Sequence, residues 1–230
     1  MGETYMIFIP YKPFILRKVQ VDFAYGFEQD KHLKILDIFE RIGFSPRLKK
    51  FQKHYHASCT RLGAGSYAKT FCTPALQDDA IKIQKQPDPS YQLWMEEFVL
   101  TGQRNPFVPQ VRGYATNNTG RTLCIMERLY RPTFDAEALN SFEWFRRNTG
   151  NTISRDELNA HVKAILKIET MSQDLMAIID YIAEVSSHGT LHSVDLSRGN
   201  IMQRKNGEMV ITDPLAVFAH TFEVFMGHNQ

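Results

Sequence analysis

Asp195-Leu196-Ser197-Arg198-Gly199-Asn200 and Thr212-Asp213-Pro214 are the two stretches that decide the fold of this chain. Between them, Asn206-Gly207 separates two strand-like runs, and an Asn-Gly pair favours a β-hairpin closed by a type I′ turn. Such a hairpin would return Asn200 and Asp213 to the same end of a small sheet. Asp195 would lie beside them, so the sequence predicts three polar side chains around one space.

The three predicted neighbours have side chains suited to phosphate chemistry. Two oxygen ligands suit magnesium, a hard ion that takes its remaining ligands from water and phosphate oxygens. The remaining acid is then available to accept a proton from a hydroxyl group. The alternative is that these residues only form turns, because Asp and Asn are common turn residues.

A glycine-rich turn lies far upstream, in Leu62-Gly63-Ala64-Gly65-Ser66-Tyr67-Ala68. Glycines let backbone amides approach phosphate oxygens without a Cβ in the way. A Gly-x-Gly pattern by itself is more typical of a plain turn. The turn therefore gains meaning only together with other residues.

Lys82 is the first of those residues. It follows apolar residues in a strand-like run, where a buried ammonium would need a partner and an exposed one would not. Glu96 and Glu97, on the next predicted helix, are the candidate partners. We favour Glu96 because Leu93 lies behind it and Val99 and Leu100 lie ahead of it, which gives it apolar neighbours, and Glu97 remains the alternative.

The first half of the chain after residue 57 is predicted to contain three strands, one helix and two more strands. The helix opens at Pro87-Asp88-Pro89-Ser90 and has an apolar face. The strands alternate with a period of two and are expected at Ser58–Leu62, Tyr67–Thr73, Ala80–Gln84, Val111–Ala115 and Thr122–Glu127.

The second half of the chain is predicted to be helical before the hairpin. Ser154 and Glu157 form a capping-box pattern that starts one helix. A break is expected near Ser172, because an uninterrupted helix to Ser187 would be unusually long. The second helix places Leu175, Ile178, Ile179, Ile182 and Val185 inward, with Gly189 as its C′ residue.

This order of motifs resembles the protein-kinase fold, in which a glycine-rich loop, a strand lysine, a helix glutamate, an Asp-x-x-x-x-Asn loop and a metal-binding aspartate follow one another. More narrowly, it resembles the early serine/threonine kinases of T-seven-like short-tailed bacteriophages. The likeness runs from about Ala57 to Val217, and its most specific pieces are Gly199-Asn200-Ile201-Met202 and Ile211-Thr212-Asp213-Pro214.

The resemblance implies a role for each candidate residue in binding ATP and Mg²⁺. Asn200 and Asp213 would hold the magnesium ion, and Asp195 would orient the acceptor hydroxyl and take its proton. Lys82, oriented by Glu96, would hold the α- and β-phosphates. The backbone of Gly63, Ala64, Gly65 and Ser66 would cover the phosphates, and Met126, Glu127 and Leu129 would belong to the linker whose backbone meets adenine.

Some residues depart from the common kinase pattern. Val194 stands where an arginine usually precedes the catalytic aspartate, and Pro214 follows Asp213 in place of Phe-Gly. Ser197 occupies the position of the usual lysine, and Arg198 is expected to supply that positive charge instead. Only 17 residues follow Asp213, which leaves no room for an activation segment.

We therefore expect an α+β chain with a compact, two-lobed, protein-kinase-like fold and a shortened C-terminal lobe. Residues 1–57 would form an N-terminal extension, residues 58–129 the N-lobe and residues 130–230 the reduced C-lobe. The implied function is an ATP-dependent serine/threonine kinase of a bacteriophage that phosphorylates host bacterial proteins early in infection, with transcription machinery as a target class. A catalytically idle kinase fold that inhibits a host protein, and a small-molecule phosphotransferase, are the alternatives.

Composition excludes several other classes. The net charge is +2, so no large basic field exists to bind nucleic acid, and no apolar run is long enough for a membrane span. Three cysteines without close pairs indicate thiols in a reducing cytoplasm, here that of the host cell. A zinc site at His54, His56 and Cys59 is a minor alternative, because no second cluster at ligand spacing follows.

Overall fold

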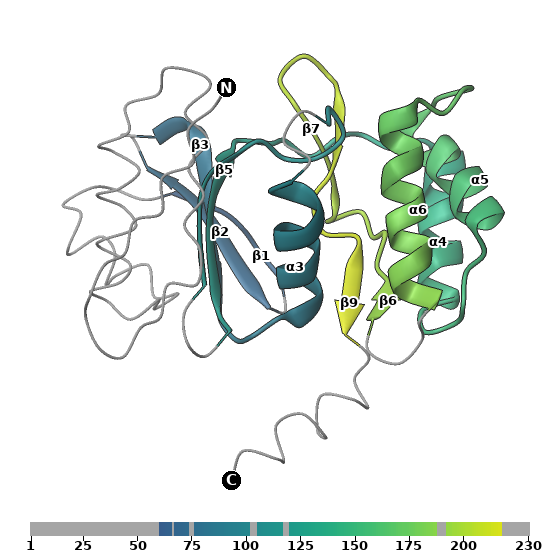
Figure 1. Ribbon diagram of the computed structural model, residues 1–230. Helices are drawn as coiled ribbons and strands as arrows, with labels where there is room; N and C mark the ends of the chain where they lie inside the picture. The colour runs from purple at the N-terminus through teal and green to yellow at the C-terminus, as the bar shows by residue number, and fades with distance from the viewer. Residues whose placement is uncertain are drawn as a thin grey trace, which may run out of the picture. The chain divides into compact units, whose positions relative to one another are not determined.

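The computed structural model describes residues 60–65, 67–73, 76–101, 105–116, 120–187 and 192–217. They belong to two compact units (Figure 1). The described residues within 60–88 and 110–128 form the sheet unit, and those within 89–109 and 129–217 form the helical unit. The predicted α+β class is confirmed. Ser66, the predicted extension and the candidate zinc ligands His54, His56 and Cys59 lie outside the described residues.

The sheet unit is built on one antiparallel sheet of five strands in the order β1-β2-β3-β5-β4. All five predicted strands are confirmed, although the third begins earlier than the sequence indicated. Their bounds are Thr60–Ala64 for β1, Ala68–Thr73 for β2, Leu76–Gln84 for β3, Val111–Thr116 for β4 and Thr122–Glu127 for β5.

Alternation along β3 explains where its side chains lie. Ile81 and Ile83 are fully buried on one face, whereas Lys82 points to the other and is half-buried. Lys82 stands opposite Thr70 on β2 and Cys124 on β5. Cys124 is fully buried, as expected for a thiol that packs as a small apolar group.

The helical unit contains the predicted helix between the third and fourth strands, as α3 (Pro89–Leu93) and the π-helical turn η1 (Trp94–Val99). Three longer helices and two strand pairs follow it, and the first helix and the first pair were not predicted. The helices are α4 (Ala136–Arg147), α5 (Arg155–Leu166) and α6 (Gln173–Ser187), and the pairs are β6 (His192–Val194) with β9 (Leu215–Val217) and β7 (Ile201–Gln203) with β8 (Met209–Ile211).

The predicted start of α5 is confirmed as a complete capping box. The Ser154 hydroxyl accepts from the backbone N–H of Glu157, and the Glu157 carboxylate accepts from the backbone N–H of Ser154 at 2.9 Å. The break near Ser172 is also confirmed, because α5 ends at Leu166 and Lys167 takes a left-handed conformation with φ of 55°. Such a residue commonly terminates a helix.

The inward face of α6 is confirmed for four of its five predicted residues. Val185 is only partly buried, and Gly189 lies outside the described residues. The four buried residues are Leu175, Ile178, Ile179 and Ile182.

Replacing Ser154 with alanine should lower the melting temperature by about 2–4 °C, the shift expected when one N-cap acceptor is lost from a protein of this size. Differential scanning calorimetry would measure it. Ser172→Ala is a matched comparison, because the Ser172 hydroxyl also accepts from a helix N–H, that of Leu175, at 3.2 Å. An unchanged melting temperature in Ser154→Ala would contradict the capping assignment.

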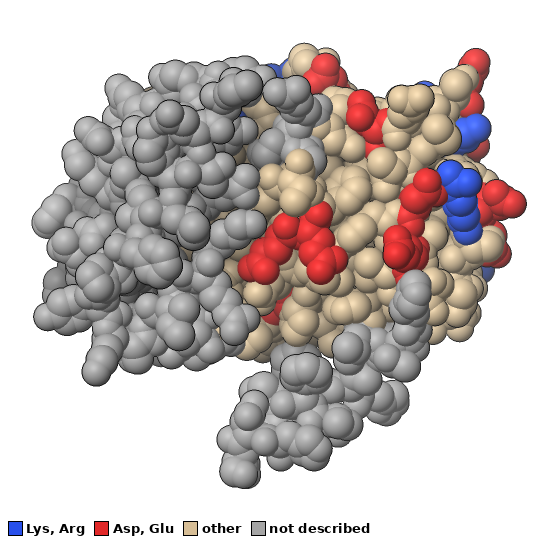
Figure 2. Space-filling view, viewed as in Figure 1, with Lys and Arg blue, Asp and Glu red and all other residues tan. Residues whose placement is uncertain are grey.

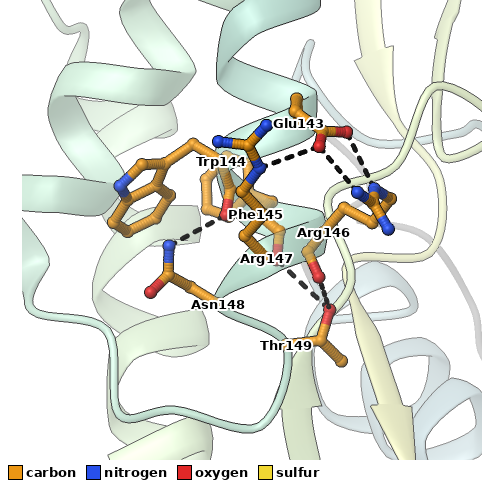
Figure 3. A network of polar contacts seen from close by, with 7 residues as sticks. All are labelled: Glu143, Trp144, Phe145, Arg146, Arg147, Asn148 and Thr149. Carbon is orange, nitrogen blue, oxygen red and sulfur yellow. Dashed lines mark hydrogen bonds and ion pairs between the residues drawn. The ribbon is translucent and has the colours of Figure 1, made fainter.

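The last turns of α4 carry an ion-pair network (Figure 3). The Glu143 carboxylate accepts from Arg146 Nε at 2.7 Å and from Arg147 Nε at 2.9 Å. Hydrogen bonds from Arg146, and then from Arg147, lower the pKa of Glu143 to about 2. The network is exposed, so it contributes little to stability.

The β7–β8 hairpin is confirmed, but its turn is not type I′. Gly207 has φ of 90°, whereas Asn206 is not among the described non-glycine residues with positive φ. The Arg204 carbonyl accepts from Gly207 N–H at 3.0 Å, and Arg204 N–H donates to the Glu208 carbonyl at 2.8 Å. These bonds define a three-residue loop, a type I turn followed by a glycine in the left-handed region.

Among the described residues, no helix is both long enough and apolar enough to cross a membrane.

Candidate active site

The segment after β6 is held against the segment before β9. The backbone N–H of Asp195 donates to the carbonyl of Pro214 at 2.7 Å, which continues the antiparallel pairing of the two strands. Pro214 directly follows Asp213 in the chain. The pairing therefore fixes the two aspartates on neighbouring segments of backbone, even though 18 positions separate them in the sequence.

Asn200 contacts Asp195 directly. Its amide nitrogen Nδ2 donates to the Asp195 carbonyl at 2.8 Å and to the Asp195 carboxylate oxygen Oδ2 at 3.0 Å. The backbone N–H of Asn200 closes the intervening turn by donating to the Ser197 carbonyl at 2.9 Å. The asparagine thus orients the aspartate through its nitrogen, and its side-chain oxygen is the atom with the chemistry of a metal ligand.

Thr212 links the same asparagine to Asp213. Its backbone N–H and its hydroxyl both donate to the Asn200 carbonyl, at 2.8 and 3.1 Å. Thr212 and Pro214, the two neighbours of Asp213, are therefore bonded to Asn200 and Asp195 respectively. The three polar residues that the sequence placed around one space are brought together, and each of them is partly exposed.

Arg198 lies in the exposed turn between Asp195 and Asn200. A guanidinium at that position is accessible to a solvent-borne anion. The role that the resemblance implies for Arg198 stays a prediction.

The two glutamates of η1 have different surroundings. Glu96 is half-buried and accepts from Gln92 Nε2 at 3.1 Å, whereas Glu97 is exposed and accepts from the Tyr181 hydroxyl at 3.4 Å. Figure 2 shows acidic side chains on the surface in the region of α3. Burial, and then Glu97, raise the pKa of the Tyr181 phenol, so Tyr181 remains a hydrogen-bond donor. The pairing of Lys82 with Glu96 stays a prediction, since the two residues belong to different units.

The glycine-rich turn makes its hydrogen bonds with other residues of the sheet unit. Gly65 N–H donates to the Ala68 carbonyl at 3.0 Å, and the Lys85 ammonium donates to the Gly65 carbonyl. A Cβ built on Gly63 or on Gly65 would meet none of the described atoms within 4 Å. Neither residue has a positive φ, the backbone conformation that favours glycine. Neither space nor backbone angle therefore requires glycine at these two positions, although Gly63 follows a register shift in the pairing of β1 with β2.

Part of the predicted adenine linker belongs to strand β5, and its backbone N–H groups bond within the sheet unit. Met126 and Glu127 end β5, and the backbone N–H of Glu127 donates to the Gln110 carbonyl at 2.8 Å. The next N–H, that of Arg128, donates to the Asp78 carbonyl at 2.7 Å. Of the predicted linker, Leu129 is therefore the residue left as the candidate amide donor to a nucleotide base.

Sequence reasoning missed the contacts of three residues that the structure connects to these motifs. Trp94 donates its indole N–H to the Thr212 carbonyl at 3.1 Å, although the sequence predicted only its place on the apolar face of a helix. Lys85 was also missed, although it lies close to the glycine-rich turn. Thr212 was part of the quoted Thr212-Asp213-Pro214 motif, but its bonds to Asn200 were not predicted. Within the described residues, no group of three or more His, Cys, Asp or Glu side chains is placed to hold a metal ion.

No family model matches this chain, and no curated protein matches it. Solved structures of aminoglycoside phosphotransferases are similar at low scores. The GDP and kanamycin complex of APH(2″)-IIia is 11% identical, with a TM-score of 0.35 over 70% of this chain and 68% of that chain. ADP-bound APH(2″)-Ib is 13% identical with a TM-score of 0.31, and the likeness covers 74% of this chain and 70% of that one. The fold description rests instead on the strand order and the contacts above.

Proposed function

We propose that this protein transfers the γ-phosphoryl group of ATP to a serine or threonine hydroxyl of a protein. The observation that carries the proposal is the bonded arrangement of Asp195, Asn200 and the Asp213 segment. Phosphoryl transfer requires mainly positioning and charge neutralisation, and these residue types can supply both. The order of the remaining motifs along the chain supports the same reaction.

Magnesium fits the donor set of this loop. The Nδ2 atom of Asn200 is engaged by Asp195, so the amide presents its oxygen on the other side, and Asp213 supplies a carboxylate from the neighbouring segment. One amide oxygen and one carboxylate are a typical protein contribution to a magnesium ion, which completes its coordination with water and phosphate oxygens. When bound, the ion would neutralise the charge of the transferring phosphate.

Asp195 has the role of aligning the acceptor. Its backbone is fixed by Pro214 and its carboxylate by Asn200, so the carboxylate has a defined direction. A carboxylate held in this way can accept the hydrogen bond of an acceptor hydroxyl and take its proton as the new phosphoester bond forms. The acceptor oxygen then bonds to the γ-phosphorus while the bond to the ADP oxygen breaks.

The sheet unit supplies the phosphate-binding groups in this proposal. Lys82 would neutralise α- and β-phosphate charge, and the backbone near Gly63 and Gly65 would lie against the phosphates. The open space beside Gly63 and Gly65 is compatible with this role, because a phosphate could approach the backbone there without displacing described protein atoms. Leu129 would supply the backbone amide that meets adenine.

Replacing Gly63 or Gly65 with valine should raise the KM for ATP about 10-fold while the melting temperature stays unchanged. A β-branched side chain has room in the protein alone but would occupy space needed by the phosphates. Steady-state kinetics together with calorimetry would test this, with Gly207→Val as the contrasting variant. At Gly207 the positive φ makes any side chain strained, so that variant should lose stability and keep its KM.

The acceptor class is tested by incubating the purified protein with γ-labelled ATP and Mg²⁺, alone, with bacterial lysate, and with a panel of small hydroxylated compounds that includes aminoglycosides. Labelled protein bands containing phosphoserine or phosphothreonine are the expected result. Labelled bacterial proteins would support the host targets that the sequence resemblance implies. A labelled small molecule would establish the small-molecule phosphotransferase instead, and no label in any mixture would favour an idle kinase fold.

A further inference from the structure

The segment formed by α3 and η1 is hydrogen-bonded to the rest of the helical unit at several points along its length. At its start, Ser90 Oγ and His192 Nδ1 are hydrogen-bonded at 2.8 Å. At the junction of α3 and η1, the Tyr181 hydroxyl of α6 donates to the Leu93 carbonyl at 3.3 Å. Figure 1 shows the segment beside β9, the strand that follows the Asp213 segment. Its position relative to that segment is therefore set by several independent bonds.

Trp94 bonds to Thr212, the residue directly before Asp213. It is fully buried, and its indole N–H donates to the Thr212 carbonyl at 3.1 Å. The indole ring stacks on Phe98 with centroids 4.9 Å apart and 7° between the planes, and Tyr181 packs on it at 5.8 Å. These rings leave the indole one orientation, so the direction of its N–H is fixed.

We propose that Trp94 is a positioning residue for magnesium, because its indole N–H fixes the peptide group from which Asp213 projects. The inference rests on the proposed function. The Thr212 carbonyl belongs to the peptide bond that joins Thr212 to Asp213. Asn200 already holds the other side of Thr212, through the backbone N–H and the hydroxyl. Trp94 therefore supplies the hydrogen bond that fixes the rotation of the peptide leading into the metal-binding aspartate.

Trp94 is the first residue of the π-helical turn η1. In η1 the Leu100 N–H bonds to the Met95 carbonyl at 2.8 Å, five residues back, so the turn is wider than an α-helical one. Phe98 follows Trp94 by four residues in this turn, and their rings stack. Single π-helical turns occur frequently at functional sites.

The test compares Trp94→Phe with Tyr181→Phe. Each replacement removes one hydrogen-bond donor from the same aromatic cluster and keeps an aromatic ring, but only the first removes the bond to Thr212. Trp94→Phe also removes part of a fully buried ring, so calorimetry of both variants accompanies the binding measurement. Manganese(II) binding in the presence of a non-hydrolysable ATP analogue, followed by electron paramagnetic resonance, reports the metal site directly. Trp94→Phe should weaken manganese binding about 3- to 10-fold, the range for loss of one neutral hydrogen bond. Tyr181→Phe should leave it unchanged, and the analogue should bind both variants equally without metal.

A second measurement uses the native indole and needs no change at position 94. Trp144→Phe leaves Trp94 as the single tryptophan, so its indole ¹H–¹⁵N resonance is assigned by elimination. That resonance should be protected from solvent exchange and should shift when Mg²⁺ is added to the analogue complex, because coupling between the two groups is reciprocal. Equal manganese affinity in wild-type and Trp94→Phe protein would overturn the inference. An indole resonance whose chemical shift does not change when Mg²⁺ is added would overturn it as well. Wild-type protein that binds no metal–nucleotide complex would overturn the proposed function itself.

Discussion

Replacing Asp195 with asparagine should reduce the rate of phosphoryl transfer by about 10²- to 10⁴-fold, the range associated with loss of a general base and of its hydrogen bond to the acceptor. Asparagine keeps the size of the side chain but cannot take a proton. Its KM for ATP should change little, because Asp195 acts on the acceptor in this account. The measurement is steady-state transfer of labelled phosphate at saturating ATP and acceptor.

Asp156→Asn is the matched control for that variant. Asp156 is an exposed aspartate in the first turn of α5, so the same chemical change there should leave the transfer rate unaltered. Circular dichroism would establish that both variants are folded. A rate for folded Asp195→Asn within about twofold of the wild type would remove Asp195 from the chemistry, since general-base help exceeds that factor.

Replacing Asp213 with alanine should reduce transfer at least about 10²-fold at ordinary Mg²⁺ concentrations, the scale seen when electrostatic stabilisation of the transition state is lost. The physical reason is the loss of the one carboxylate that the proposed magnesium site contains. Raising the Mg²⁺ concentration should restore part of the activity of this variant and none of that of Asp195→Asn. A titration of the transfer rate against Mg²⁺ measures the difference, and identical titration curves for wild-type and Asp213→Ala protein would contradict the assignment.

The parts of the structure that the sequence predicted well are those controlled by local rules. Alternation of apolar residues located all five strands of the sheet unit, and the Ser154–Glu157 pattern located the start of α5. The convergence of Asp195, Asn200 and the Asp213 segment was also predictable, because a hairpin must return its two ends to one place. In these cases a short run of sequence, namely the alternation, the capping pattern or the hairpin turn, determines the local structure.

The features that were missed depend on contacts between distant residues. The β6–β9 pair joins residues 192–194 to residues 215–217, and neither run is long enough to indicate a strand by itself. The π-helical turn η1 has the same apolar spacing as an α-helix, so its extra width could not be read from the sequence. Trp94 stands on the apolar face predicted for the helix that opens at Pro87, and its bond to Thr212 could not be read from the sequence because it crosses 118 positions of the chain.

The predicted type I′ turn of the β7–β8 hairpin was wrong for a different reason. Asn-Gly favours a two-residue type I′ loop, but the pairing of β7 with β8 ends at Gln203 and Met209 and leaves a longer connection. The strand register therefore decided the turn type. Gly207 supplies the left-handed conformation that the longer loop needs, with φ of 90°.

One double-mutant cycle tests most directly the claim that Lys82 and Asp213 serve the same phosphoryl transfer. It compares the transfer rates of wild-type protein, Lys82→Ala, Asp213→Ala and the double variant. Residues that act as one unit give strongly non-additive effects, so the double variant should be about as slow as the slower single variant. Losses that multiply in the double variant would contradict a shared role, and full activity in folded Asp213→Ala would contradict the central claim.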